Sequence, residues 1–283
     1  MVAEATIDRP VFIVSAPRSG SSLLFQTLAQ APDAFSIGGE SHGLIETIPG
    51  LHPAERGWHS NRLAATDATP AVIAELTRRF RGALRDRHGR PPRGPARLLE
   101  KTPKNSLRVP FVRAAYPDAL FVLLYRDPRE TVASMIEAWR SGNFRTYPRL
   151  PGWTNLPWSL LLVPGWIELN RLPLSEIAAR QWVGVTTALL DEFENNPPAA
   201  LVEYAAFLAD PQDTIERVAA AVGLGWDRSL PAQLPLSPTV VSHPAAGKWQ
   251  RDSATIDALW PILEPVDARA RAVMAAFSRS AGP

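Results

Sequence analysis

The chain has 283 residues, a formal net charge of +2 and no cysteine. The small net charge argues against a polybasic nucleic-acid binder, and the lack of cysteine excludes disulfides, thiol catalysis and cysteine-ligated metals. Residues 1–10 lack the basic start and apolar stretch of a signal peptide. No run approaches the ~18 apolar residues of a membrane helix. We therefore expect a cytoplasmic protein without stable membrane insertion.

The predicted elements begin with a strand, a loop and a helix. Val11–Val14 is a short apolar run, rich in β-branched residues, that is typical of a buried central strand. After a loop over residues 15–20, Ser21–Gln30 carries apolar residues at helical spacing. A strand, a glycine-containing loop and a helix open a nucleotide-binding α/β fold.

Strands and helices then alternate along the chain. The further predicted strands are Ala34–Ile37, Arg97–Glu100, Leu120–Tyr125 and Leu201–Tyr204. Three helices, each begun by a capping residue followed by proline, are predicted over Ala71–Arg87, Arg129–Trp139 and Gln212–Val222. This order predicts an α/β, P-loop-like, three-layer fold, in which helices flank a central, mostly parallel sheet of about five strands.

Two segments interrupt the alternation. Residues 88–95 form a surface loop by composition. Residues 142–173 are rich in Pro, Gly and Trp, and we expect an ordered insertion that serves as a lid or acceptor region within a single domain of residues 1–283. Trp139 fits an apolar helix face and is predicted to be core. For Trp153, Trp158 and Trp166, acceptor contact and packing on the domain explain the pattern equally well.

The segment Ser15–Ser22 has the composition of an anion-binding loop. Its helix start offers free N–H groups and a positive dipole end, its serines offer hydroxyls, and its glycine allows close approach. It is not a Walker loop, because the lysine is absent and the glycine spacing is too short. A turn that caps a core helix is the alternative. The candidate binding residues are Pro17, Arg18, Ser19, Gly20, Ser21 and Ser22.

This loop resembles the 5′-phosphosulfate loop of sulfotransferases that use 3′-phosphoadenosine 5′-phosphosulfate (PAPS). A second segment is similar to that family's 3′-phosphate site: Arg126-Asp127-Pro128 ends the strongest strand, and Ser134 follows two turns along the next helix. The pattern is closest to the bacterial tyrosylprotein and small-molecule branch. The resemblance implies PAPS as co-substrate, adenosine 3′,5′-bisphosphate (PAP) as product, and a hydroxyl of a small molecule as acceptor.

Weaker matches extend the resemblance over most of the chain. Gly38-Gly39-Glu40 resembles the segment with the family's catalytic carboxylate, and Lys101 stands where a family lysine faces the sulfuryl group. The resemblance also implies that Tyr204 lies near the nucleotide, and that Lys248 and Trp249 belong to a loop that closes over the donor phosphates. Tyr204 and Trp249 are equally well explained as contacts of the adenine or as core aromatics. Ser237 and Thr239 are weaker phosphate-binding candidates. The chain departs from the cytosolic eukaryotic branch, which has lysine at the position of Arg18.

Sulfuryl transfer needs in-line geometry and charge stabilisation rather than covalent catalysis. Arg18 and Lys101 are the candidates to stabilise the leaving oxygen. Glu40 is the first candidate for the base, with a pKa expected to be raised by desolvation, and His42 is its rival. Glu40 as a plain helix N-terminal acid is the alternative. No metal is expected, because the sulfuryl group carries less charge than a phosphoryl group.

Two other functions stay open at this point. One is a P-loop kinase of a small molecule, and the other is a non-catalytic nucleotide-binding protein on the same scaffold. The Ala-, Arg- and Pro-rich composition is typical of a GC-rich bacterial genome, which suggests an acceptor from secondary metabolism or a lipid-like one. The sequence predicts neither the identity of the acceptor nor the oligomeric state.

Overall fold

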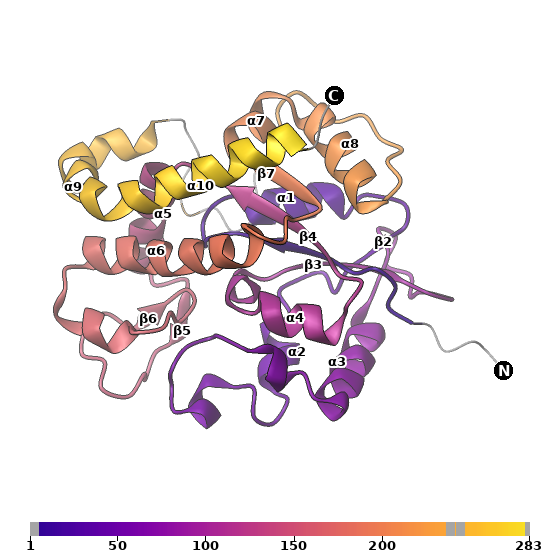
Figure 1. Cartoon of the computed structure of the whole chain (residues 1–283), viewed down its shortest axis with the longest axis horizontal. Coiled ribbons are helices and arrows are strands. Elements are labelled where there is room, and N and C mark those ends of the chain that lie inside the picture. Colours follow the sequence, from indigo (N-terminus) through magenta and orange to yellow (C-terminus); the bar gives the residue numbers. More distant parts are fainter. Residues whose placement is uncertain (1–5, 236–240, 242–246, 281–283) are drawn as a thin grey trace.

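The computed structural model describes residues 6–235, Val241 and residues 247–280. A five-stranded parallel sheet lies at its centre, in the order β2-β3-β1-β4-β7 (Figure 1). The strands are β1 (Val11–Val14), β2 (Ala34–Phe35), β3 (Arg97–Lys101), β4 (Leu120–Tyr125) and β7 (Ala200–Glu203). Each was predicted from the sequence, and the α/β fold with a sheet flanked by helices is confirmed.

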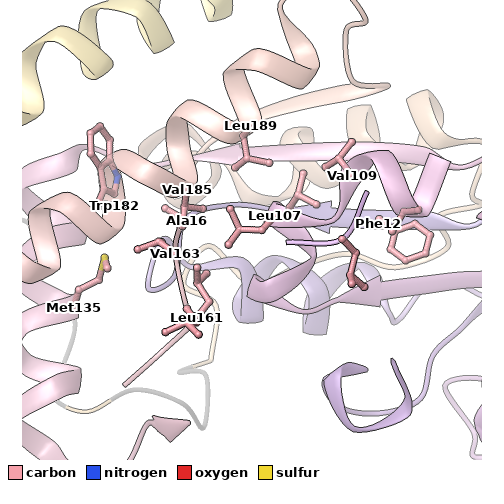
Figure 2. Close-up of a cluster of buried hydrophobic side chains, with 14 of the residues drawn as sticks. Phe12, Ala16, Leu107, Val109, Met135, Leu161, Val163, Trp182, Val185 and Leu189 are labelled. Atoms are coloured by element: carbon pink, nitrogen blue, oxygen red, sulfur yellow. The ribbon is translucent and has the colours of Figure 1, made fainter. Parts of the chain in front are cut away.

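Alternating residues of the central strands supply two separate apolar clusters, as the two faces of a sheet require. Phe12 and Val14 of β1 belong to the larger cluster, and Val11 and Ile13 belong to the smaller one. The larger cluster includes residues of α6, which lie beside Ala16 and other residues of the same cluster in Figure 2. Both faces of the sheet are therefore covered, and its strand ends remain as the place for a ligand.

Helices fill both outer layers. They are α1 (Ser21–Leu28), α2 (His42–Glu46), α3 (Pro70–Ala83), α4 (Val109–Ala115), α5 (Pro128–Ser141), α6 (Leu174–Phe193), α7 (Tyr204–Ala209), α8 (Pro211–Val222), α9 (Ser253–Ala258) and α10 (Trp260–Ser280). The three predicted proline-started helices form as α3, α5 and α8, each capped by the side chain of the preceding Thr or Asp. Helix α3 ends earlier than predicted, because the backbone of Arg85 pairs with Ser36.

The insertion at residues 142–173 is ordered and carries the short antiparallel pair of β5 (Arg145–Tyr147) and β6 (Trp158–Ser159). Behind this pair, four indole rings pack with centroids 4.8–6.3 Å apart; they are those of Trp139, Trp153, Trp158 and Trp166. Trp139 is core, as predicted. That the other three contact an acceptor stays a prediction: they pack on one another and are not among the residues that line the cavity described below.

Two further points concern the chain as a whole. Within the described residues, none of the helices has the length and apolar content to cross a membrane. The assignment of residues 1–283 to one domain stays a prediction.

Candidate functional site

A cavity of about 1310 Å³ opens where the strands of the sheet end. Segments that follow all five strands line it, as is usual for ligand sites in open α/β sheets. They contribute Pro17 after β1, Glu40 after β2, Pro103 after β3, Arg126 after β4 and Tyr204 after β7. Since a single small-molecule pocket occupies about 300–1,000 Å³, this cavity has room for two ligands side by side.

The loop after β1 reaches the cavity in a conformation that depends on Gly20. This residue caps α1 with a φ of 99°, in the left-handed region that favours glycine. A Cβ atom at this position would lie 2.2 Å from the ring of Tyr204. Tyr204 therefore packs directly against Gly20 of this loop. Pro17, Ser21, Ser22 and Tyr204 all line the cavity.

Arg18 joins the two predicted phosphate segments. Its Nε donates to Ser134 Oγ on α5 at 3.4 Å, and its guanidinium lies 4.7 Å from the ring centroid of Phe144. Its backbone carbonyl accepts a hydrogen bond of 3.2 Å from Arg126 Nη1. Burial lowers the pKa of Arg18, and the nearby Glu137 carboxylate opposes that shift. The structure thus brings together three residues that the sequence placed in one donor site.

Two carboxylates of α5 form ion pairs with Arg126 and Lys248. Glu130 Oε2 lies 3.1 Å from Arg126 Nη2, and Glu130 Oε1 accepts the backbone N–H of Gly247 at 2.7 Å. Glu137 pairs with Lys248 at 2.9 Å. Sequence reasoning missed both glutamates. Their spacing of three and four residues from Ser134 could have signalled a shared helix face.

Glu40 and Lys101 form an ion pair at the cavity. Lys101 Nζ lies 2.8 Å from Glu40 Oε1, and His42 Nδ1 lies 3.5 Å from Glu40 Oε2. Burial alone would raise the pKa of Glu40, but the hydrogen bond with His42 and the charge of Lys101 outweigh it and lower the pKa to about 2. The expectation of a raised pKa is wrong, because the two basic neighbours stabilise the ionised carboxylate.

A buried hydrogen-bond network fastens the segments that carry this pair. The carboxylate of Glu100, the residue before Lys101, accepts hydrogen bonds from Ser41 Oγ at 2.6 Å and from Thr102 Oγ1 at 2.5 Å. Asn105 Nδ2 donates to its other oxygen at 2.8 Å. Burial raises the pKa of Glu100. Because Ser41 follows Glu40 directly, the network fixes the two ends of the Glu40–Lys101 pair.

The remaining predicted site residues divide into two groups. Lys248 and Trp249 line the cavity, and Trp249 lies 5.2 Å from the Arg129 guanidinium. Ser19 and Lys101 are not among the lining residues: Ser19 borders a smaller cavity beneath the loop, and Lys101 is buried behind Glu40.

Two further observations complete the comparison with the predicted site. Ser237 and Thr239 lie outside the described residues. In the part of the chain that the structure describes, no group of three His, Asp or Glu side chains is arranged to hold a metal ion.

A protein-family model described as "Sulfotransferase family" matches residues 10–158. The chain belongs to the sulfotransferase family. The matched residues include the loop after β1, Glu40, Lys101 and helix α5.

Known proteins are similar in sequence to a part of this chain, and solved structures are similar to it in fold. Protein-tyrosine sulfotransferase A of Caenorhabditis elegans is 32% identical over 130 residues, which cover 44% of this chain and 32% of that protein. The chain thus matches less than half the length of the nematode relatives. A sulfotransferase from Mycobacterium avium has a TM-score of 0.52 at 17% identity, with 93% of this chain and 77% of that chain covered. A mouse sulfotransferase in complex with PAP has a TM-score of 0.50 at 13% identity, over 96% and 90% of the two chains.

Proposed function

We propose that this chain transfers the sulfuryl group of PAPS to a hydroxyl group of a small molecule. The observation that carries the proposal is the contact of Arg18 with Ser134, which joins the anion loop to α5 at one cavity wall. A donor with a phosphosulfate at one end and a 3′-phosphate at the other can contact both segments. The PAP bound to the mouse structure of similar fold supports this donor.

In the proposed complex, the 5′-phosphosulfate lies at the start of α1. Gly20, Ser21 and Ser22 offer backbone N–H groups and hydroxyls there, and the dipole of α1 favours an anion. Arg126 and Ser134 bind the 3′-phosphate. Lys248 and Trp249 of the C-terminal segment contact the donor from another side of the cavity, and Tyr204 packs against Gly20 of the loop.

The transfer is an in-line displacement at sulfur. The acceptor oxygen forms a bond to sulfur while the bond from sulfur to the bridging oxygen of the 5′-phosphate breaks, and PAP leaves with that oxygen. Glu40 is ionised at neutral pH and takes the proton of the attacking hydroxyl. Arg18 stabilises the charge on the bridging oxygen. Lys101, which contacts Glu40 directly, keeps the base ionised and oriented.

Tyrosine side chains of proteins are the second candidate acceptors, because the nematode relative is named a protein-tyrosine sulfotransferase. The residues on the side of the cavity beyond Glu40 favour a small molecule as the acceptor. There, the buried pair of Glu46 and Lys104 borders the cavity, whose lining also includes the apolar side chains of Phe144 and Leu161. A kinase activity has no support in the loop after β1, which lacks the Walker lysine.

The test offers a library of hydroxyl compounds and tyrosine peptides either PAPS with a radiolabelled sulfuryl group or ATP–Mg²⁺ with a radiolabelled γ-phosphate, and measures transfer of the label. The wild-type protein is expected to sulfate at least one acceptor. Glu40→Gln is expected to lower kcat by 10²–10⁴-fold, the range typical of a lost general base, with PAP affinity changed less than twofold.

Glu264→Gln, which alters an exposed glutamate on α10, is the matched control and should retain wild-type turnover. Transfer from ATP but not from PAPS would refute the proposed function. Normal turnover in Glu40→Gln would remove Glu40 as the base.

A further inference from the structure

A second acid–lysine pair lines the same cavity as Glu40. Glu46 and Lys104 follow Glu40 and Lys101 by a short stretch of the same two segments, and Lys104 Nζ lies 2.8 Å from Glu46 Oε2. Glu40 lies two residues before α2 and Glu46 is its last residue, so this helix, which rises about 7 Å, separates their backbone positions. The cavity therefore has two polar positions a small molecule's length apart.

The second position carries an excess of positive charge. Glu46 also pairs with Arg108 at 2.5 Å, and the side chains of Glu46, Lys104 and Arg108 are 8%, 8% and 0% exposed. These three side chains hold two cations and one carboxylate. Since a buried charge without a counter-charge is costly, an anion that enters this end of the cavity is stabilised there.

The hydroxyl of Tyr147 provides a hydrogen-bond donor at the same place. Its oxygen accepts from Lys104 Nζ at 3.0 Å and from Asn61 Nδ2 at 2.6 Å. The amide of Asn61 is fixed in this orientation, because its Oδ1 accepts the N–H of Leu162 at 2.6 Å. Both contacts use lone pairs of the phenol oxygen. Its own hydrogen is left to donate, and within the described residues no acceptor receives it.

Two properties of the neighbouring residues define the ligand further. Burial raises the pKa of Tyr147, so that the phenol keeps its hydrogen at neutral pH. His52 Nδ1 accepts the N–H of Ala54 at 3.0 Å, which leaves the hydrogen of a neutral imidazole on Nε2, and His52 lines the cavity beside Tyr147. Phe144 and Leu161 add apolar side chains to the lining of the same cavity.

We propose that the end of the cavity formed by Tyr147, Lys104 and Glu46 binds a carboxylate of the acceptor, so that the acceptors are hydroxy acids with a small apolar body. The acceptor's hydroxyl lies at Glu40, and its carboxylate accepts the hydrogen of Tyr147 beside the Lys104 ammonium. This inference rests on the proposed function, and it specifies the class of acceptor.

The experiment compares each acid with its methyl ester, which keeps the hydroxyl and the body but removes the charge. The pairs are 4-hydroxyphenylacetic acid, 3-(4-hydroxyphenyl)propanoic acid and 6-hydroxyhexanoic acid with their esters. The wild-type protein is expected to show at least a tenfold higher kcat/KM with the acid than with the ester in one or more pairs. Tyr147→Phe is expected to reduce that ratio below threefold.

Tyr116→Phe is the matched control. Tyr116 is a buried tyrosine whose hydroxyl contacts Thr77 outside the cavity, and its loss should leave the ratio of acid to ester unchanged. Calorimetric titration of acid and ester into the wild-type complex with PAP gives the same comparison without a variant, in case Tyr147→Phe does not fold.

The outcomes separate the two proposals. Sulfation of acid and ester at equal efficiency in every pair would overturn the carboxylate site and leave sulfuryl transfer intact. An unchanged ratio in a folded Tyr147→Phe would also overturn it. If PAPS supports no transfer at all, the proposed function fails, and the titrations decide alone: equal affinity for acid and ester, or no binding of either, would then refute the carboxylate site.

Discussion

Gly20 shows how a single residue can depend on both its own backbone and a distant side chain. Its φ of 99° is strained for any residue with a Cβ, and the ring of Tyr204 fills the space that a Cβ would need. The first constraint is local to the loop that precedes α1. The second needs the contact between the β1 loop and the start of α7, which no local pattern reveals.

Gly20→Ala is expected to lower the free energy of unfolding by about 1–3 kcal/mol, through backbone strain and the clash with Tyr204. It should also weaken PAP binding at least tenfold, because the loop must shift. Gly82→Ala is the matched control: Gly82 is exposed on α3 with open space around it, and alanine there is expected to stabilise by about 0.5–1 kcal/mol. Urea unfolding and calorimetry with PAP measure both. Unchanged PAP affinity in Gly20→Ala would contradict the role of this loop.

The pH dependence of turnover distinguishes Glu40 from His42 as the base. A lowered pKa means that the ionised form of Glu40 is present above its value of about 2 and is lost only as the pH falls through it. We therefore expect kcat/KM to change less than threefold between pH 7 and pH 5. An imidazole base would lose activity below roughly pH 6.5.

Lys101→Met sharpens this test. Without the ammonium, burial raises the pKa of Glu40 with less opposition, so the acid-side loss of activity should move to a higher pH than in the wild type. The measurement is kcat/KM from pH 4.5 to 8 at constant ionic strength, with circular dichroism at each pH to confirm folding. A tenfold fall in wild-type kcat/KM between pH 7 and 5.5 would favour His42.

At the scale of elements, helix α5 shows what a sequence can and cannot reveal of a site. Arg126 and Ser134 could be predicted, because one ends a buried strand and the other follows on the next helix. The spacing of Glu130 and Glu137 indicates that they share a helix face with Ser134, but not that they pair with part-buried cations, since charged residues on a helix usually mark a solvated face. Only the return of the C-terminal segment onto α5 makes them partners of Gly247 and Lys248.

The tryptophan cluster leads to a prediction for the insertion. Trp158 is completely buried, and its indole N–H donates to the carbonyl of Leu161 at 3.1 Å. Trp158→Ala is expected to cost about 3–5 kcal/mol of unfolding free energy. PAP affinity should change less than threefold, because Trp158 does not line the cavity.

Ile167→Ala is the control in the same insertion. Ile167 is 48% exposed, and its truncation should cost less than about 0.5 kcal/mol. Urea denaturation with and without PAP measures both variants. A large loss of PAP affinity with little loss of stability in Trp158→Ala would instead assign the cluster to the donor site.

For the whole molecule, the sequence was sufficient to predict five strands and their layered arrangement, and all of the predicted donor-binding residues that the structure describes, except Ser19, line the cavity. It did not reveal α6 or α10, which lack a side-chain cap or a clear start signal. It also did not reveal the buried network around Glu100 or the pair of Glu46 and Lys104. These polar groups come from segments far apart in the chain, and their meaning depends on burial that only the packed sheet creates.

The central place of β1 in the sheet has a consequence for synthesis. Val11 of β1 pairs with Leu99 of β3 and Leu120 of β4, so β1, which precedes both strands in the chain, obtains its second neighbour only after β4 has been translated. At ~5–20 residues per second, that interval is roughly 5–22 s. During it, an entirely apolar strand lacks a partner on at least one edge. The nascent chain is therefore most in need of chaperone protection between the translation of β1 and that of β4.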